Sequence, residues 1–306
     1  MKDLEKAIID TVAYFDIFDY PLTDMEIWKW LVFNNDEIKS VSLFDVKSIL
    51  SDSDYLQSKI EFSQGHYFFR GRKDIINIRR QRYSLAEKKY RRALNVIKIL
   101  RFAPFVKMVA ICNTLAFSNS RDESDIDLFI VTKRNRVWQS RFWVAGFLKL
   151  FKMRPSNNKS KDTICSSFFV DEDHLNLEKF SIKNDIYLLY WITQIIPVYN
   201  YDIYDKFVSA NTWTKKILPN TLQINPVKKR SLSKVKLFKV IIDFVLTFFP
   251  EKIFKNYQLK IMPANLSKLA NKDTRVVVND NVLKFHDNDR REIFLQKWET
   301  RKSEII

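Results

Sequence analysis

The chain has 306 residues, of which 46% are hydrophobic and 29% are charged, a composition typical of a soluble globular protein with two or three domains. Its formal net charge of +16 indicates either a polyanionic partner, such as a nucleotide or RNA, or a generally basic surface. Two cysteines exclude a disulfide-rich scaffold, and the longest apolar run is too short for a transmembrane segment.

Residues 1–75 are predicted to form a winged-helix-like domain. A helix with apolar residues at helical spacing begins the chain. Thr23 and Glu26 then have the spacing of a capping box, which predicts the start of a second helix. A third helix is predicted over 43–52, and two strand-like runs joined at Gly65 follow it. Three helices and a hairpin are the elements of a winged helix.

The charge of the third helix bears on what this unit does. A winged helix contacts DNA through that helix and through the wing. Here Asp45 and Asp52 offset Lys47, so the helix is not basic. DNA binding by this unit is therefore not favoured, and a packing or adaptor role is the preferred interpretation.

Residues 76–180 are predicted to form an α/β domain that begins with a basic helix. The segment 73–101 is read as a long helix or a helix pair, with Ser84 and Glu87 as a second capping box. Residues 76–110 carry ten Lys/Arg and one Glu. A segment further on, 133–161, carries nine Lys/Arg and no acid. We expect Lys and Arg side chains of 79–101 and 133–154 to rim the site that lies between them in the sequence.

Alternation and hydrophobicity predict the small sheet of this domain. Strands are expected over 106–112, 125–132 and 163–170, with a helix at about 137–152. The fold class is therefore α+β, with a small mixed β-sheet. Residues 181–306 are predicted to form a helical domain.

One helical run in this last region, 240–249, is the most apolar of the chain. We expect a core helix there. Because basic residues flank the run, a helix that lies on a membrane surface is the alternative.

Asp125 and Asp127 are the candidate catalytic and metal-binding residues. Residues two apart in a strand share a face, so both carboxylates project together while Ile126 and Leu128 enter the core. Two like charges this close are costly unless a cation neutralises them. Hard carboxylate oxygens are the ligands that Mg²⁺ prefers.

The run "CNTLAFSNSRDESDIDLFIV" (112–131) resembles the DNA polymerase β-type nucleotidyltransferase superfamily. The signature of that superfamily is a strand that ends in Gly-Ser or Gly-Gly, a short helix, and a strand that carries Asp-x-Asp. Nearly the whole chain is similar to a group of bacterial and archaeal proteins that carry this domain. The similarity includes the leading winged-helix-like unit and the segments "FRGR", "ANTWTKKILPN" and "FHDNDRREIF".

The resemblance implies a function and its cofactors. Asp125 and Asp127 would hold Mg²⁺, and a nucleoside monophosphate would pass from an NTP to an acceptor with release of pyrophosphate. Asn113, Thr114 and Ser124 would bind the nucleotide.

The sequence departs from the family pattern at two places. Asn113 and Thr114 replace the Gly-Ser pair; Asn tolerates the positive φ that glycine supplies there, and Thr114 keeps a hydroxyl. The strand 163–170 has no acid in its interior. Asp162 and Asp171, at its two ends, are the candidates for the third carboxylate that the family uses.

Three functions remain open at this point. The first is an active nucleotidyltransferase, and the second is a catalytically degenerate domain that binds nucleotide or RNA. The third is a winged-helix regulator with a structural α/β body. The chain starts with charged residues and has no signal-peptide pattern, and its two cysteines are expected to be buried free thiols, so we expect a cytoplasmic protein. The three histidines share no metal-ligand spacing and are expected on the surface or in loops.

Overall fold

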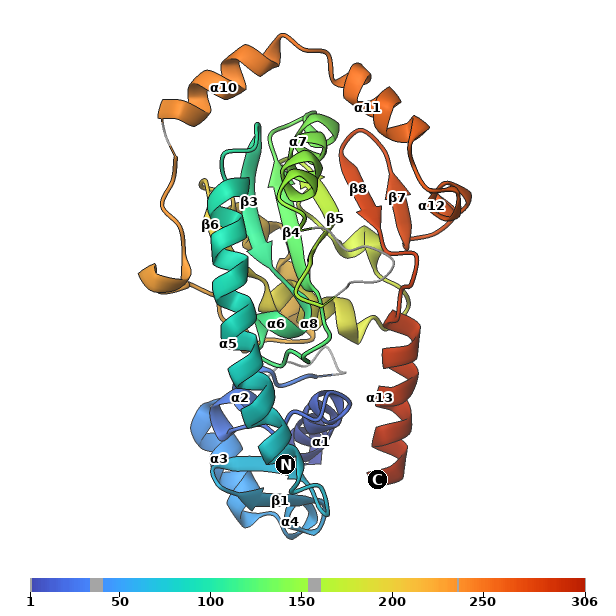
Figure 1. Ribbon diagram of the computed structural model, residues 1–306. Coiled ribbons are helices and arrows are strands. Elements are labelled where there is room, and N and C mark those ends of the chain that lie inside the picture. Colours follow the sequence, from blue (N-terminus) through green and yellow to red (C-terminus); the bar gives the residue numbers. More distant parts are fainter. Residues whose placement is uncertain (1, 34–40, 154–160, 236, 306) are drawn as a thin grey trace.

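The structure is a computed structural model that describes residues 2–33, 41–153, 161–235 and 237–305 (Figure 1). It is a mixed α+β fold built around a six-stranded mixed sheet, as expected for the class. Among the described residues, no helix is both long and apolar enough to cross a bilayer.

The N-terminal unit contains the predicted helices and hairpin. The Thr23 hydroxyl accepts from the Glu26 N–H while the Glu26 carboxylate accepts from the Thr23 N–H, so the predicted capping box is confirmed. The hairpin turns at Gln64 and Gly65, both at positive φ. The elements are α1 (Lys2–Asp16), α2 (Asp24–Lys29), α3 (Leu43–Asp52), α4 (Asp54–Lys59), β1 (Ile60–Ser63) and β2 (His66–Phe69).

Helix α5 (Ile75–Leu100) connects this unit to the sheet. It is one continuous helix, so Ser84 lies in its interior and donates to the Arg80 carbonyl. The predicted capping box of Ser84 and Glu87 is therefore wrong. A cap requires a non-helical residue, and here the backbone remains helical on both sides.

The six-stranded sheet has the order β6-β3-β4-β5-β8-β7. Strands β4 and β5 are parallel and are connected by α7 (Val137–Leu150), whereas the other neighbours are antiparallel. The strands are β3 (Val106–Ile111), β4 (Ile126–Thr132), β5 (Ile164–Asp171), β6 (Ile196–Asn200), β7 (Val276–Val278) and β8 (Val282–Phe285). The three strands and the helix predicted for residues 76–180 are confirmed within two residues at each end.

The interpretation of residues 181–306 as a purely helical domain is wrong, because β6, β7 and β8 belong to the sheet. Strand β6 contains Pro197, which the sequence marks only as the end of a helix. β6 lies at an edge of the sheet, where a proline needs no partner for its missing N–H. The remaining elements are α6 (Asn113–Ala116), α8 (Ile186–Gln194), α9 (Tyr204–Ala210), α10 (Leu237–Thr247), α11 (Glu251–Lys260), α12 (Ala264–Leu269) and α13 (Arg291–Ile305).

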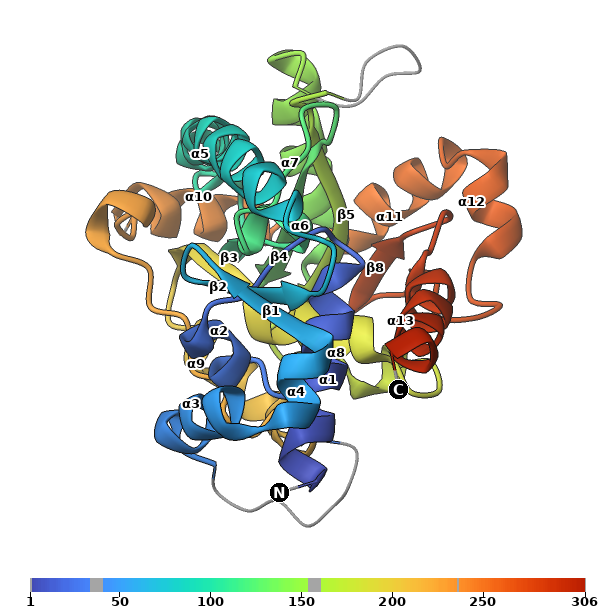
Figure 2. The ribbon, with the colours of Figure 1, turned by 90° about the horizontal axis from the view of Figure 1, so that it is seen from below.

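Each face of the sheet has its own core. Residues of α5 and α7 cover one face and residues of α8 and α9 cover the other. A further core cluster joins the N-terminal unit to Tyr190 of α8 and Trp298 of α13. Helix α13 accordingly descends beside α1 (Figures 1 and 2). Residues near the C-terminus thus complete the packing of the first unit.

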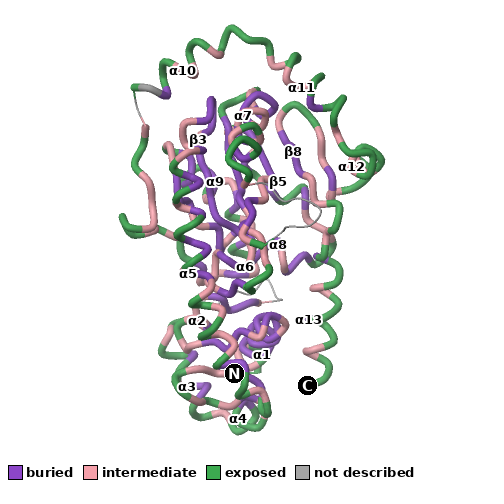
Figure 3. Tube along the Cα trace, in the orientation of Figure 1, coloured by how far each residue is buried: buried purple, intermediate pink, exposed green. Residues whose placement is uncertain are grey.

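The interpretation of 240–249 as a core helix is also wrong. Helix α10 exposes Leu237, Val240, Ile241 and Phe244 to solvent. Figure 1 shows α10 and α11 as an arch over the end of the sheet that lies away from the N-terminal unit, and Figure 3 shows that most of this arch is exposed.

Candidate functional site

The predicted aspartates lie where β4 begins. Ile126 and Leu128 are buried in the core under α5 and α7, as the alternation predicts. Asp127 points to the opposite face, which is covered by α8, and Asp125 directly precedes the strand. Both aspartates are partly buried. The period-two spacing therefore places the two carboxylates together, as expected.

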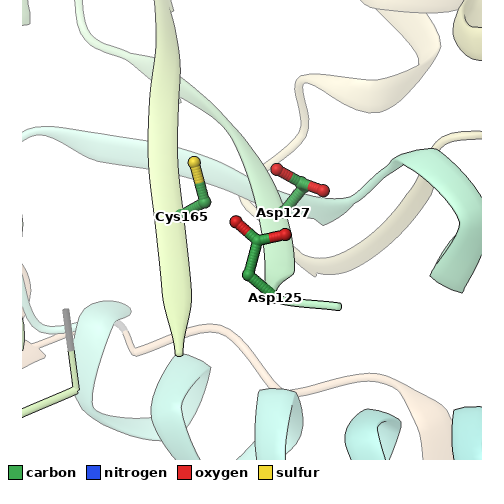
Figure 4. A group of neighbouring side chains, drawn as sticks. All are labelled: Asp125, Asp127 and Cys165. Carbon is green, nitrogen blue, oxygen red and sulfur yellow. The ribbon is translucent and has the colours of Figure 1, made fainter. Parts of the chain in front are cut away.

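A third side chain, Cys165 of β5, joins them. Asp127 and Cys165 are register partners in the parallel pair, and one carboxylate oxygen of each aspartate and the cysteine sulfur all lie within 4.8 Å of one another (Figure 4). The next register partners, Phe129 and Phe168, show that β5 has one extra residue here, a β-bulge. A thiol thus occupies the place beside the aspartates where the resemblance implies a carboxylate.

Burial is the main cause of the raised pKa values of the two aspartates. It raises the pKa of Asp127 to about 7, and the neighbouring charge of Asp125 adds to the effect. Burial also raises the pKa of Asp125, against the positive charge of Lys89. A cation between the carboxylates would favour their charged forms and reverse both shifts. The site is therefore suited to a cation.

The turn before α6 supports Asp127. Asn113 has φ +56°, the positive value at which asparagine replaces glycine. Its side-chain oxygen accepts from the Trp191 indole (2.8 Å) and the Tyr187 hydroxyl (3.1 Å), and its side chain hydrogen-bonds to Asp127. Thr114 follows as the second residue of α6 and is partly buried. Asn113 thus supplies the backbone conformation and also orients a carboxylate.

Lys89 of α5 holds the loop that leads to β4. Its buried ammonium group donates to the carbonyls of Asp122 (3.0 Å) and Ser124 (2.6 Å) and to the Asp162 carboxylate (2.7 Å). The Ser124 hydroxyl donates to the Arg121 carbonyl (2.9 Å), so this predicted nucleotide-binding residue is used within the loop. Lys89 therefore positions the segment from which Asp125 projects.

Neither candidate for a third carboxylate joins the site. Asp162 forms its ion pair with Lys89. Asp171 lies at the other end of β5, where its carboxylate accepts from Asn281 (2.8 Å) and contacts His174 (2.6 Å). The expectation that Asp162 or Asp171 completes the site is wrong, because both carboxylates are held elsewhere.

Sequence reasoning missed a short polar chain beside the aspartates. Ser167 hydrogen-bonds to Cys165, and its hydroxyl lies 2.8 Å from Nε2 of His286. Burial lowers the pKa of His286 to about 3, so the ring is neutral at physiological pH. Polar residues in the strand after Asp-x-Asp are the only sequence signal for this group. His286 directly follows β8, far along the chain; it lies in a loop, one of the two expected places, and is partly buried.

The basic segments border the site only in part. Lys89 acts on Asp125, as the prediction for the first segment requires. Arg134 and Arg136 follow the opposite end of β4, where Arg134 pairs with Asp173 and Arg136 donates to the Phe249 carbonyl (3.2 Å). The prediction that the second segment surrounds the aspartates is wrong for these two arginines.

No protein-family model matches the chain, and neither a curated protein nor a solved structure is significantly similar to it. The function has to be inferred from the chemistry of the site. Two carboxylates and a thiol at one end of parallel strands form a partly buried set of donors for a cation.

Proposed function

We propose that this chain is a metal-dependent nucleotidyltransferase that transfers a nucleoside monophosphate from an NTP to an acceptor and releases pyrophosphate. The convergence of the Asp125 and Asp127 carboxylates supports this proposal most strongly. The order of elements around them, a strand, a turn at positive φ, a short helix and the strand with Asp127, agrees with the resemblance of the sequence.

The donor set fits Mg²⁺ in part. Asp125 and Asp127 offer hard oxygen ligands and would hold the ion. The bound ion would neutralise the triphosphate and stabilise the charge that develops during transfer. The Cys165 sulfur is a soft ligand, which Mg²⁺ does not favour. Burial and the Asp127 charge raise the pKa of this thiol, so it is protonated at neutral pH and brings no third negative charge.

The chain's own residues would position the reacting groups. Asn113 orients Asp127, and Lys89 fixes the loop of Asp125. Asn113 and Thr114 begin the short helix that faces the aspartates, where we propose that the nucleotide phosphates bind. The acceptor would be a small molecule, a protein or RNA, and the basic charge of the chain favours a polyanion. We place the reaction in the cytoplasm, where NTP and Mg²⁺ are abundant.

A second candidate function is a degenerate domain that binds nucleotide or RNA without turnover. The thiol of Cys165 beside the two carboxylates is the observation that favours it, because sulfur is a poor ligand for a second Mg²⁺. A winged-helix regulator receives less support. On α3 the Asp45 carboxylate caps its own helix and Lys47 pairs with Asp24, so this helix presents little free positive charge.

The decisive experiment incubates the full chain with each radiolabelled NTP, with and without Mg²⁺, in the presence of total RNA. We expect Mg²⁺-dependent release of pyrophosphate by the wild type. Asp125→Asn and Asp127→Asn should each reduce it at least about a hundredfold, because each removes a ligand charge at the transferring phosphoryl group. Asp122→Asn is the matched control, since this exposed carboxylate lies in the same loop and pairs with Lys161. Its turnover should equal that of the wild type.

Turnover that survives Asp127→Asn would contradict the proposal. If no NTP is consumed, thermal melting with Mg²⁺ and nucleotide distinguishes the second candidate. A stabilisation seen in the wild type and lost in Asp127→Asn would assign the chain to the binding domain. Cys165→Asp adds the third carboxylate and should then raise pyrophosphate release above background.

A further inference from the structure

The arch formed by α10 and α11 carries a continuous apolar stripe on its outer surface. Leu237, Val240, Phe244 and Phe248 follow one another at helical spacing, and 79%, 59%, 66% and 72% of these residues is exposed. The Phe244 and Phe248 rings contact each other edge to face, with centroids 5.4 Å apart. Beyond Pro250, Ile253 of α11 is exposed as well, whereas Tyr257 and Ile261 line a cavity against α7, where the Tyr257 ring contacts Phe142.

Two polar side chains of α10 bond to the body. Asp243 accepts from the Phe105 N–H (2.8 Å), and the buried Lys239 ammonium donates to the Ala103 carbonyl (2.7 Å). An amphipathic helix on a globular protein normally buries its apolar face and exposes its polar face. Helix α10 follows this rule only in part. Ile242 and Leu246 face the body, where they line a cavity with Phe102 and Phe147. Leu237, Phe244 and Phe248 stay exposed, so the packing of the described residues does not explain them.

The connection between the two helices is held in the same way. The Glu251 carboxylate accepts from the N–H groups of Trp138 (2.6 Å) and Gln139 (3.0 Å) at the start of α7. Arg136 donates to the Thr247 carbonyl (3.1 Å) and Gln139 to the Leu246 carbonyl (3.1 Å). These polar contacts fix the arch in place while Phe244, Phe248 and Ile253 stay exposed.

The acidic side chains of the arch and its exposed lysines lie on different faces. The two acidic residues of α10 and α11, Asp243 and Glu251, both turn toward the body. Lys252 and Lys260 are exposed beside the apolar stripe. In the segment that leads into α10, Lys228 and Lys229 are exposed, whereas Arg230 pairs with Glu87 and Lys234 with Asp202. The outer surface of the arch is therefore apolar and positively charged.

We propose that α10 and α11 bind the surface of an anionic lipid bilayer, with the apolar stripe inserted at the level of the headgroups. An interfacial helix of this kind combines large apolar side chains with lysines that contact anionic lipids. A second copy of the chain fits the charges less well, because a symmetric pairing would place the exposed lysines of the two copies near one another. This inference is independent of the proposed nucleotidyl transfer.

The test is flotation of the full chain with vesicles. We expect binding to mixed phosphatidylglycerol–phosphatidylcholine vesicles that weakens as salt increases, and much weaker binding to pure phosphatidylcholine. The double variant Phe244→Gln, Phe248→Gln should bind the anionic vesicles at least about tenfold more weakly, because it removes two inserted rings. Lys252→Glu with Lys260→Glu should also weaken binding to the anionic vesicles.

Phe44→Gln is the matched control. Phe44 is 77% exposed on α3, far from the arch in the fold, so its substitution should leave vesicle binding unchanged. The folding of each variant is checked by circular dichroism and thermal melting. Absence of wild-type binding to anionic vesicles, or equal binding by the Phe244/Phe248 double variant, overturns the proposal. A wild-type dimer that this double variant dissociates, without vesicle binding, also overturns it and assigns the face to a second copy.

Discussion

The two ends of the sheet depart from the usual distribution of polar and apolar groups in opposite ways. At one end, the carboxylates of Asp125 and Asp127 are partly buried side by side. At the other, α10 exposes Leu237, Ile241 and Phe244. The first arrangement costs electrostatic free energy and the second leaves apolar area in contact with water. Each cost would be removed by a particular kind of ligand.

The comparison shows that each departure from ordinary packing indicates the chemistry of the partner that would remove its cost. A buried pair of like charges is stabilised by a cation, and an exposed apolar face beside lysines is stabilised by an apolar, anionic surface. In a chain whose other elements follow ordinary packing rules, such exceptions are where function is expected. Substitutions at the two places should therefore affect stability very differently.

The largest effect on stability is expected for Lys89→Met, which removes the cation that holds the loop of Asp125. The carbonyls of Asp122 and Ser124 would lose their donor, and Asp162 its ion pair. We expect the free energy of unfolding to fall by about 3 kcal/mol, as measured by urea denaturation.

Lys88→Met is the control for this change, because Lys88 is exposed on the same helix. It should alter the free energy of unfolding by less than about 0.5 kcal/mol. Equal effects of the two substitutions would show that the loop is not held by Lys89.

Asp127→Asn should have a smaller effect that depends on pH. The folded chain keeps the Asp127 proton up to about pH 7, whereas the unfolded chain releases it near the ordinary aspartate value, about 4. The folded state binds more protons in this window, so the stability of the wild type falls as pH rises through it. A difference of about three pKa units corresponds to about 4 kcal/mol. Because Asp127 is only partly buried and water screens its charge, we expect the metal-free variant to be about 2 kcal/mol more stable than the wild type at pH 8. The two should be about equally stable at pH 4.

Urea denaturation at both pH values in the presence of a chelator measures this difference. A difference that is the same at pH 4 and pH 8 would contradict the raised pKa. Added Mg²⁺ should stabilise the wild type at pH 8 and reduce the advantage of the variant.

The smallest effect is expected on the arch. Phe244→Gln should change the free energy of unfolding by less than about 0.5 kcal/mol, since the ring is exposed. Loss of a buried ring such as Phe129, on the strand of Asp127, would cost about 3–5 kcal/mol. A marked loss of stability in Phe244→Gln would show that Phe244 is packed against other residues in solution. The arch would then no longer be an exposed apolar surface.

Local sequence patterns predicted many of the helices and strands, and they identified Asp125, Asp127 and Asn113 as residues of the site. The alternation around Asp127 predicted that the two carboxylates lie together at a strand, and the tolerance of asparagine for positive φ anticipated Asn113. The spacing of Thr23 and Glu26 identified a helix start. Each of these features depends on residues close together in the sequence.

The features that were missed depend on contacts between distant segments. Cys165 and His286 join the site through strand pairing, which a single sequence does not reveal. Strands β6, β7 and β8 have only three to five residues, too few for a clear alternation. The apolar run 240–249 predicted a core helix, with a membrane-surface helix as the alternative, but hydrophobicity alone does not show whether such a helix faces the core or the solvent.

Helix α5 has a mechanical consequence. Its 26 residues make a rod about 39 Å long, and no glycine or proline interrupts it. Arg79 forms an ion pair with Glu26 of the N-terminal unit. Lys89, about 15 Å further along the axis, donates to the Ser124 carbonyl in the loop before Asp125. A continuous helix moves as one rigid body. A displacement of the N-terminal unit would therefore be transmitted along α5 and would move the Asp125 carboxylate.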